Sequence, residues 1–224
     1  MTPRVVLAAP IYRGEAHLEQ AVRSLLAQTE TDFRLLLVDD ASTDGTVPLA
    51  RALAAEDPRI EVHVNERRLG MLGNTQRAWA LAAERCPEAP YVALASDHDV
   101  WAPEWLAELV GALEGAPEAV LAYPLTTRID AAGEDVPGLR TWRCSTAGIA
   151  DPYRRLRRSY RCMVAGDMIY GLMRADAFAR AGSYQAVLVP DRLLLSRLAL
   201  EGEFIQVERL LWRRRFVGLA DLER

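Results

Sequence analysis

The chain has 224 residues, of which 50% are hydrophobic, and its formal net charge is −4. It contains no lysine, so all 27 of its basic residues are arginines. This composition is typical of one globular domain with a sizeable core, and it excludes disordered and fibrous proteins. The mild negative charge also argues against a nucleic-acid partner, because nucleic-acid-binding proteins usually carry a basic stripe.

Cysteine spacing and the N-terminal segment indicate the cellular compartment in which the protein is expected. The three cysteines (Cys86, Cys144 and Cys162) are far apart, and no CxxC pair occurs. We therefore expect reduced thiols in a cytoplasmic protein. The apolar run Val5–Ala9 is too short for a signal peptide or a membrane span. A membrane contact, if there is one, would be peripheral and on the cytoplasmic face.

The first half of the chain alternates short apolar runs with longer amphipathic stretches. Strands are predicted at Val5–Ala9, Arg34–Val38, Ile60–Val64, Tyr91–Ala95 and Ala119–Tyr123. Helices are predicted between them at Glu15–Gln28, Gly45–Glu56, Met71–Arg85 and Pro103–Leu113. Apolar strands separated by helices predict an α/β domain with a Rossmann-like, mainly parallel sheet and helices on both faces.

The pattern weakens after Tyr123, and residues 124–150 are predicted to form a loop or a β-excursion. The later predicted elements are the strand Met168–Met173, the helices Asp176–Ala181 and Arg192–Leu200, and the strands Phe204–Val207 and Leu210–Arg213. Because no linker or repeat is visible, we interpret residues 1–224 as a single domain with two halves, 1–123 and 124–224.

Polar and aromatic residues follow three of the predicted strands. In open parallel sheets, ligands bind beyond the carboxyl ends of the strands. Tyr12 has a core position as its alternative, but at the carboxyl end of a strand it is well placed to stack on a base. Asp40 is placed to accept a hydrogen bond from a base or from ribose hydroxyls. Asp44 is more simply interpreted as a cap of the following helix.

The segment Asp97-His98-Asp99 follows the apolar strand Tyr91–Ala95. Carboxylates are the ligands that Mg²⁺ and Mn²⁺ prefer, and these ions usually bind phosphate oxygens at the same time. We therefore predict a Mg²⁺ or Mn²⁺ site at Asp97 and Asp99, against the alternative of a solvated acidic turn. The metal would neutralise charge on a leaving diphosphate.

These motifs together resemble family 2 glycosyltransferases with the GT-A fold. The resemblance runs from about residue 4 to about residue 215. It rests on Pro10-x-Tyr12, Val38-Asp39-Asp40-Ala41-Ser42-Thr43-Asp44-Gly45-Thr46, Asp97-x-Asp99, Trp101-x-Pro103, and Asp191 with the helix to Gly202. It implies that residues 1–123 bind a nucleoside diphosphate sugar, with a UDP-sugar as the first expectation. Residues 124–224 would then bind a sugar or lipid-linked acceptor.

The resemblance also implies roles for single residues. Pro10, Tyr12 and Asp40 would contact the donor nucleotide, and Asp97 would bind its metal-diphosphate part. Family 2 enzymes invert the anomeric configuration, and a later carboxylate acts as base. That residue is expected to be Asp191, with Asp167 as the second candidate and a helix N-cap as the alternative role of Asp191.

Two departures from the family pattern affect the metal and diphosphate sites. The family's acidic pair often directly precedes a hydrophobic and an aromatic residue, which aligns it with His98-Asp99 and leaves the roles of Asp97 and His98 open. Some relatives also carry a metal-binding histidine after the last strand, where this chain has Arg213-Arg214-Arg215. We expect Arg213 and Arg215 to hold the diphosphate.

Two further hypotheses stay open. One is a glycosyltransferase-like binding module without turnover, and the other is a nucleotidyltransferase, although no glycine-rich phosphate loop follows the first strand. Separately, the basic run Arg154–Arg161 is either a solvated helix face or a contact with an anionic acceptor or membrane surface.

Overall fold

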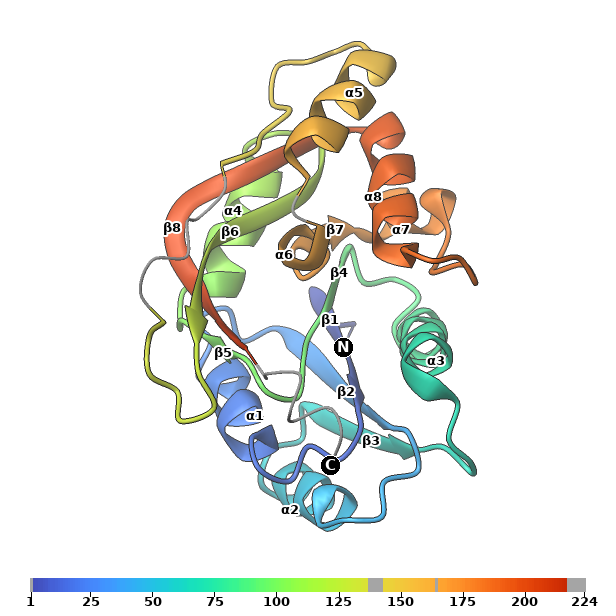
Figure 1. Ribbon diagram of the computed structural model, residues 1–224, viewed down its shortest axis with the longest axis vertical. Helices are drawn as coiled ribbons and strands as arrows, with labels where there is room; N and C mark the ends of the chain where they lie inside the picture. Colours follow the sequence, from blue (N-terminus) through green and yellow to red (C-terminus); the bar gives the residue numbers. More distant parts are fainter. Residues whose placement is uncertain (1, 137–142, 164, 217–224) are drawn as a thin grey trace.

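The computed structural model describes residues 2–136, 143–163 and 165–216. They form one eight-stranded sheet with the order β3-β2-β1-β4-β7-β6-β8-β5 (Figure 1). The strands are β1 (Val5–Ile11), β2 (Phe33–Asp39), β3 (Ile60–Val64), β4 (Tyr91–Leu94), β5 (Val100–Trp101), β6 (Ala119–Ile129), β7 (Leu172–Arg174) and β8 (Glu203–Arg215). The helices are α1 (Leu18–Leu26), α2 (Thr46–Glu56), α3 (Gly70–Arg85), α4 (Trp105–Glu114), α5 (Pro152–Cys162), α6 (Ala165–Met168), α7 (Ala175–Ala181) and α8 (Pro190–Glu201).

The parallel half of the sheet agrees with the sequence prediction. β1 lies between β2 and β4 and is parallel to both, and β2 pairs in parallel with β3. Because β1 is covered on both faces, six of its seven residues are buried, and the seventh is Pro10. Continuous burial explains why these strands read as unbroken apolar runs.

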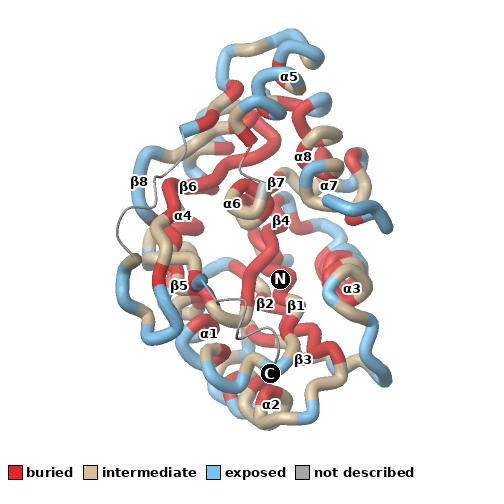
Figure 2. Tube along the Cα trace, in the orientation of Figure 1, coloured by how far each residue is buried: buried red, intermediate tan, exposed pale blue. Residues whose placement is uncertain are grey.

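Two hydrophobic cores lie on opposite faces of the sheet. Successive residues of β1 contribute to the two cores in turn: Val6 and Ala8 belong to the first core, and Leu7 and Ala9 belong to the second. The first core receives residues of α3, α7 and α8, and the second receives residues of α1, α2 and α4. Figure 2 shows the buried sheet at the centre of the molecule and the exposed segments at its rim. The predicted α/β architecture with helices on both faces is therefore confirmed.

The second half differs from the prediction in its strands. β6 continues to Ile129, so the first residues of the segment 124–150, for which a loop or a β-excursion was expected, extend the strand. The two strands expected at the C-terminal end are one continuous strand, β8, and its short partner β5 was not predicted. The parallel β6–β8 pairing shifts register near Pro124, Leu125 and Thr126. These irregularities interrupt the alternation of side chains, which is the signal from which a strand is recognised in a sequence.

The predicted strand Met168–Met173 is also wrong in its first part. α6 ends at Met168, and β7 begins only at Leu172, antiparallel to both β4 and β6. Gly171 lies between them, where a Cβ atom would approach the Ala122 carbonyl oxygen to 2.5 Å. The chain can therefore enter the sheet at this point only because residue 171 has no side chain.

The expectation of three reduced thiols is wrong for two of them. Cys144 and Cys162 form a disulfide, with their Cα atoms 5.5 Å apart, and Cys86 is a buried free thiol. The end of α5 is brought back to residue 144 by tertiary packing, which cysteine spacing does not reveal. Among the described residues, no helix is both long and apolar enough to cross a bilayer.

Candidate active site

The carboxyl ends of β1, β2 and β4 lie side by side, as the parallel order requires. Tyr12 follows β1, and its backbone N–H donates to Asp97 Oδ2 at 3.1 Å, after β4. The loop after β1 is also joined to the loop after β2, because the Arg13 N–H donates to Ser42 Oγ at 2.9 Å. Pro10 lies within β1 opposite Val38 and is partly exposed. The three predicted strand ends therefore converge.

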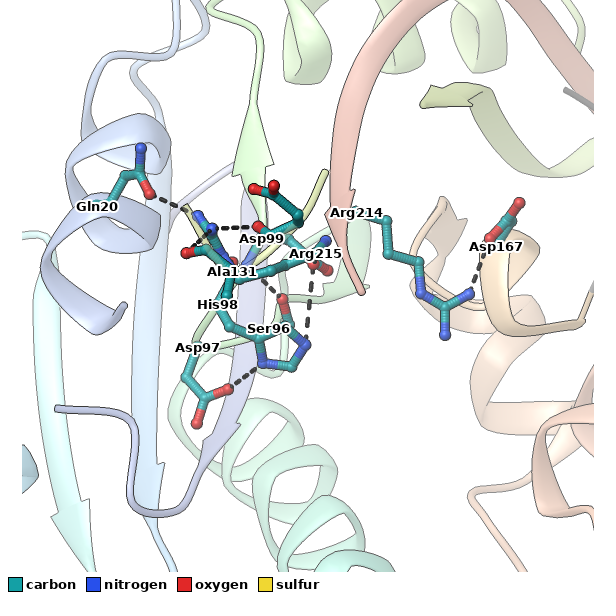
Figure 3. A network of polar contacts seen from close by, with 10 residues as sticks. Gln20, Ser96, Asp97, His98, Asp99, Ala131, Asp167, Arg214 and Arg215 are labelled. Carbon is teal, nitrogen blue, oxygen red and sulfur yellow. Dashed lines mark hydrogen bonds and ion pairs between the residues drawn. The ribbon is translucent and has the colours of Figure 1, made fainter. Parts of the chain in front are cut away.

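Asp97 and His98 form the exposed part of this convergence. His98 Nδ1 lies 2.7 Å from Asp97 Oδ1, and the two side chains are 37% and 14% exposed (Figure 3). Partial burial favours a lower pKa for His98, but the hydrogen bond with Asp97 and the charges of Asp99 and Asp97 outweigh it. The pKa of His98 therefore lies above its ordinary value. A proton on Nδ1 would leave the lone pair of Nε2 free for a ligand.

Asp99 lies behind this pair instead of beside it. Its side chain is 1% exposed, and its Oδ1 accepts a hydrogen bond from the Arg215 N–H at 2.7 Å. The Asp99 N–H in turn donates to Ser96 Oγ at 3.1 Å. Asp99 thus joins the turn after β4 to the end of β8. His98 Nε2 is 3.8 Å from Asp99 Oδ1.

Asp40 is buried and holds the N-terminus of α3. Its Oδ1 accepts from the Leu69 N–H at 2.6 Å, and its Oδ2 accepts from the Gly70 N–H at 2.8 Å. Asn65 Nδ2 also donates to Oδ1, at 3.2 Å. A carboxylate at this position satisfies free N–H groups of the helix and complements its dipole. In this structure both oxygens of Asp40 are engaged within the protein, and its residue exposure is 2%.

Two arginines that the sequence reasoning did not select flank the Tyr12 ring. The Arg68 guanidinium carbon lies 4.3 Å from the ring centroid, and that of Arg13 lies 5.4 Å from it. Arg68 follows β3, the strand beside β2, so its position after a parallel strand was the available signal. This exposed, cationic and aromatic group is suited to a planar anionic ligand.

The three consecutive arginines of β8 have different surroundings. Arg213 bonds to Asp135 Oδ1 and the Gly133 carbonyl. Arg215 is 4% exposed. Its guanidinium donates to four acceptors: the carbonyl oxygens of His98, Asp130 and Ala131, and Gln20 Oε1. Burial lowers the pKa of Arg215. Its guanidinium therefore supports the loop of residues 96–99 from behind and is not presented to a ligand, contrary to the role expected for it.

Arg214 is directed away from that cluster toward Asp167, as Figure 3 shows. Successive side chains of a strand point to opposite faces, so the Arg214 side chain lies on the other face of β8 from Arg213 and Arg215. Asp167 Oδ1 accepts from Arg214 at 2.9 Å, and Arg128 Nη2 lies 2.7 and 2.9 Å from the two carboxylate oxygens. Asp167 is thus held between two guanidinium groups, and both of its carboxylate oxygens are engaged within the protein.

Asp191 lies in the first turn of α8 and is partly exposed. Burial raises the pKa of Tyr170, and the charges of Asp99, Asp97 and Asp191 raise it further, while Arg214 opposes them. The Tyr170 hydroxyl is therefore within electrostatic reach of all three carboxylates. Asp191, from the second half of the chain, and Asp97, from the first half, therefore both act electrostatically on Tyr170.

A sequence profile of Glycosyl transferase family 2 matches residues 7–174 of the chain, which include β1, β2, β4 and the acidic turn after β4. The chain belongs to glycosyl transferase family 2. Its relatives include the putative glycosyltransferase EpsE of Bacillus subtilis, which is 30% identical over 115 residues. That match covers 50% of this chain and 39% of EpsE.

Solved structures show that this family 2 chain has the GT-A fold. The S. aureus TarS 1–349 structure in complex with UDP superposes with a TM-score of 0.71 at 14% identity, over 98% of this chain and 62% of TarS 1–349. The mannosyltransferase PcManGT from Pyrobaculum calidifontis, in complex with GDP-Man and Mn²⁺, gives 0.66 at 16% identity, over 96% of this chain and 57% of PcManGT. This family 2 chain thus spans less than two thirds of the length of each of these proteins.

Proposed function

We propose that the chain transfers a sugar from a nucleoside diphosphate donor to an acceptor hydroxyl, with a divalent metal and with inversion at the anomeric carbon. The observation that carries the proposal is the convergence of Tyr12, Asp97 and His98 at adjacent strand ends. Residues 1–123 would bind the donor. Residues 124–224 would supply the acceptor site, for a sugar or a lipid-linked sugar.

The donor nucleoside is assigned to the partly exposed ring of Tyr12, with Pro10 two residues earlier in β1. UDP-sugars are the first candidates because UDP is the nucleotide bound in the TarS complex, and GDP-sugars follow from the PcManGT complex. The Arg68 guanidinium lies over the Tyr12 ring. A base that stacks on the ring would displace this guanidinium, which could then contact the donor phosphates. Asp40 would act on the nucleoside only if its bonds to Leu69 and Gly70 open.

Replacing Tyr12 by alanine is expected to weaken nucleotide binding by about 1–3 kcal/mol, because base–aromatic stacking contributes that much elsewhere. Calorimetric titration with UDP and GDP measures the change. Tyr12→Phe keeps the ring and should bind normally, and Tyr153→Ala, an exposed tyrosine on α5, serves as the control. Unchanged affinity in a folded Tyr12→Ala protein would rule out the stacking role.

The divalent metal fits the residues present, although with a different ligand set from the one expected. Within the described residues, no group of three or more Asp, Glu, His or Cys side chains gathers as a metal site. Mg²⁺ and Mn²⁺ bound to a diphosphate need only one or two protein ligands, because phosphate and water oxygens complete the shell. We assign Asp97 and His98 to this role, since Asp99 is 1% exposed and already accepts from Arg215. When bound, the metal would neutralise the leaving diphosphate.

Asp97→Asn and His98→Ala are expected to remove the dependence of UDP affinity on Mn²⁺ and to leave the melting temperature nearly unchanged. Asp99→Ala should instead lower the melting temperature, because it breaks a buried hydrogen bond to the backbone of β8. Titrations with and without Mn²⁺, together with thermal melts, separate these effects. If Asp99→Ala melts normally and alone loses the Mn²⁺ dependence, Asp99 is the ligand and the assignment of His98 fails.

Arg214 is the arginine of the triplet best placed for the diphosphate. It is 35% exposed, and its charge acts on both His98 and Tyr170. A donor phosphate would compete with Asp167 for its N–H groups. Arg213 is 42% exposed and would reach a ligand only by leaving Asp135.

The transfer step needs one proton acceptor, and we assign this role to Asp191. The acceptor oxygen forms a bond to the anomeric carbon, the bond from that carbon to the diphosphate breaks, and the hydroxyl proton passes to Asp191. Asp191 lies in the first turn of α8, where it would act mainly by position. Asp167 is held by two arginines and is the weaker candidate.

A thermal-shift screen of UDP, GDP and dTDP sugars tests the proposal, because a bound donor raises the melting temperature by mass action. We expect at least one nucleotide sugar to raise it, and to do so more strongly with Mn²⁺. Stabilisation without any turnover of the donor would favour the inactive binding module. Stabilisation by a nucleoside triphosphate instead would favour a nucleotidyltransferase.

A further inference from the structure

Helix α5 carries an exposed face of positive charge that the proposed active site does not use. The sequence of the helix, PYRRLRRSYRC, has five arginines and no acidic residue. Figure 1 shows α5 at one end of the molecule, lying against α8. In Figure 2 much of the outer side of α5 is exposed.

The five arginines have two different roles. Arg155 is 7% exposed and binds four carbonyl oxygens, those of Ile149, Ala150, Ala199 and Leu200. It therefore anchors α5 to α8 and to the segment before α5. The other four arginines are exposed, namely Arg154, Arg157, Arg158 and Arg161.

Helical geometry places these four arginines on one continuous face. At about 100° per residue they cover roughly 100° of the helix circumference. Tyr153 and Tyr160 adjoin this arc on one side, and they are 76% and 62% exposed. The buried residues Arg155 and Ser159 lie on the opposite side. We call the set Arg154, Arg157, Arg158, Arg161, Tyr153 and Tyr160 the α5 face.

The charge of the α5 face is not neutralised within the part of the chain that the structure describes. None of its four arginines has a carboxylate within ion-pair distance there. Elsewhere in the described residues, other surface arginines form ion pairs between separate segments of the chain. The nearest polar contact is from Arg158 Nε to the Ser145 carbonyl oxygen at 3.5 Å. Four unpaired cations on one rigid face attract a surface of fixed negative charge.

We propose that the α5 face docks on an anionic lipid bilayer. A patch of arginines gains energy near a negatively charged leaflet, and tyrosines prefer the boundary between headgroups and hydrocarbon. The exposed tyrosines favour a bilayer over a soluble polyanion, which would contact the arginines alone. Docking at this end places α8, which begins with the turn that carries Asp191, next to the membrane-bound helix.

Vesicle sedimentation of the whole chain tests this proposal. At about 0.05 M salt we expect binding to vesicles with about 30 mol % phosphatidylserine and little binding to pure phosphatidylcholine, with release at about 0.5 M salt. Replacing Arg154, Arg157, Arg158 and Arg161 by glutamine should lower the partition coefficient on the order of 1,000-fold. Arg155 is left intact because it supports the fold.

A matched control removes the same charge elsewhere. Replacing Arg51, Arg77, Arg85 and Arg209 by glutamine changes the net charge equally on α2, α3 and β8, and it should lower partition several-fold at most. Tyr153→Ser with Tyr160→Ser should weaken vesicle binding but not binding to soluble polyphosphate. Should the quadruple α5 variant unfold, the pairs Arg154→Gln/Arg157→Gln and Arg158→Gln/Arg161→Gln give the same test at roughly 30-fold each.

Three results would overturn the proposal. They are equal binding of the wild type to neutral and anionic vesicles, equal losses in the α5 and control variants, and binding to polyphosphate without binding to vesicles. Calorimetric UDP affinity should be the same in the wild type and the α5 variants, so a failure of vesicle docking is distinguishable from a failure of the donor site.

Discussion

Asp191→Asn is expected to lower turnover on the order of 10²-fold or more and to leave donor and metal affinity unchanged. The amide has nearly the shape of the carboxylate and can occupy the same position in the first turn of α8, but it cannot accept the proton of the acceptor hydroxyl. Initial rates of nucleotide release, together with calorimetric titration of the donor, separate the two effects.

Asp176→Asn is the matched control for this variant. Asp176 is likewise an aspartate in the first turn of a helix, α7, but it is paired with Arg180 at the surface. Its replacement should leave turnover near normal. Near-normal turnover of Asp191→Asn, combined with a severe loss in Asp167→Asn, would move the base to Asp167. Near-normal turnover in both would remove the carboxylate base from the proposed mechanism.

Arg215→Met is expected to destabilise the protein by about 3 kcal/mol, because it leaves several buried acceptors without a donor. Those acceptors are the carbonyl oxygens of His98, Asp130 and Ala131, and Gln20 Oε1. For a chain of this size, such a loss corresponds to a fall of about 6–12 °C in melting temperature. Thermal and urea unfolding measure it.

Arg213→Met, two residues earlier on the same strand, is the control for stability. Arg213 is 42% exposed and pairs with Asp135 at the surface, so its loss should lower stability by less than about 1 kcal/mol. Equal melting temperatures for Arg215→Met and the wild type would show that the guanidinium does not support the loop of residues 96–99. Its predicted role in holding the diphosphate would then regain weight.

The parallel half of the fold was predictable from the sequence because its strands are buried on both faces. β1, β2 and β4 are apolar along almost their whole length, and helices of recognisable period separate them. The convergence of Tyr12 and Asp97 followed from the same pattern, since adjacent parallel strands end at one edge. The second half of the sheet was less predictable, because β7 depends on the absence of a side chain at Gly171.

The roles of single polar residues were harder to predict, because burial decides them. A sequence does not show that Asp99 lies under the turn while His98 lies on it. Nor does it show that Asp40 binds N–H groups of α3, or that Arg155 differs from its neighbours on α5. The alternation of β8 would have separated Arg214 from Arg213 and Arg215 if the strand had been recognised to its end.

The measurement that tests the central claim most directly is proton NMR of nucleotide sugars incubated with the chain, with and without Mn²⁺. A simple alcohol would be added as surrogate acceptor. The proposed function predicts Mn²⁺-dependent release of nucleoside diphosphate from at least one α-linked donor, with the β-anomer of the product appearing first. It also predicts that Asp97→Asn abolishes this release. Release that is independent of metal, a first product that keeps the α configuration, or no release from any donor by folded protein would contradict it.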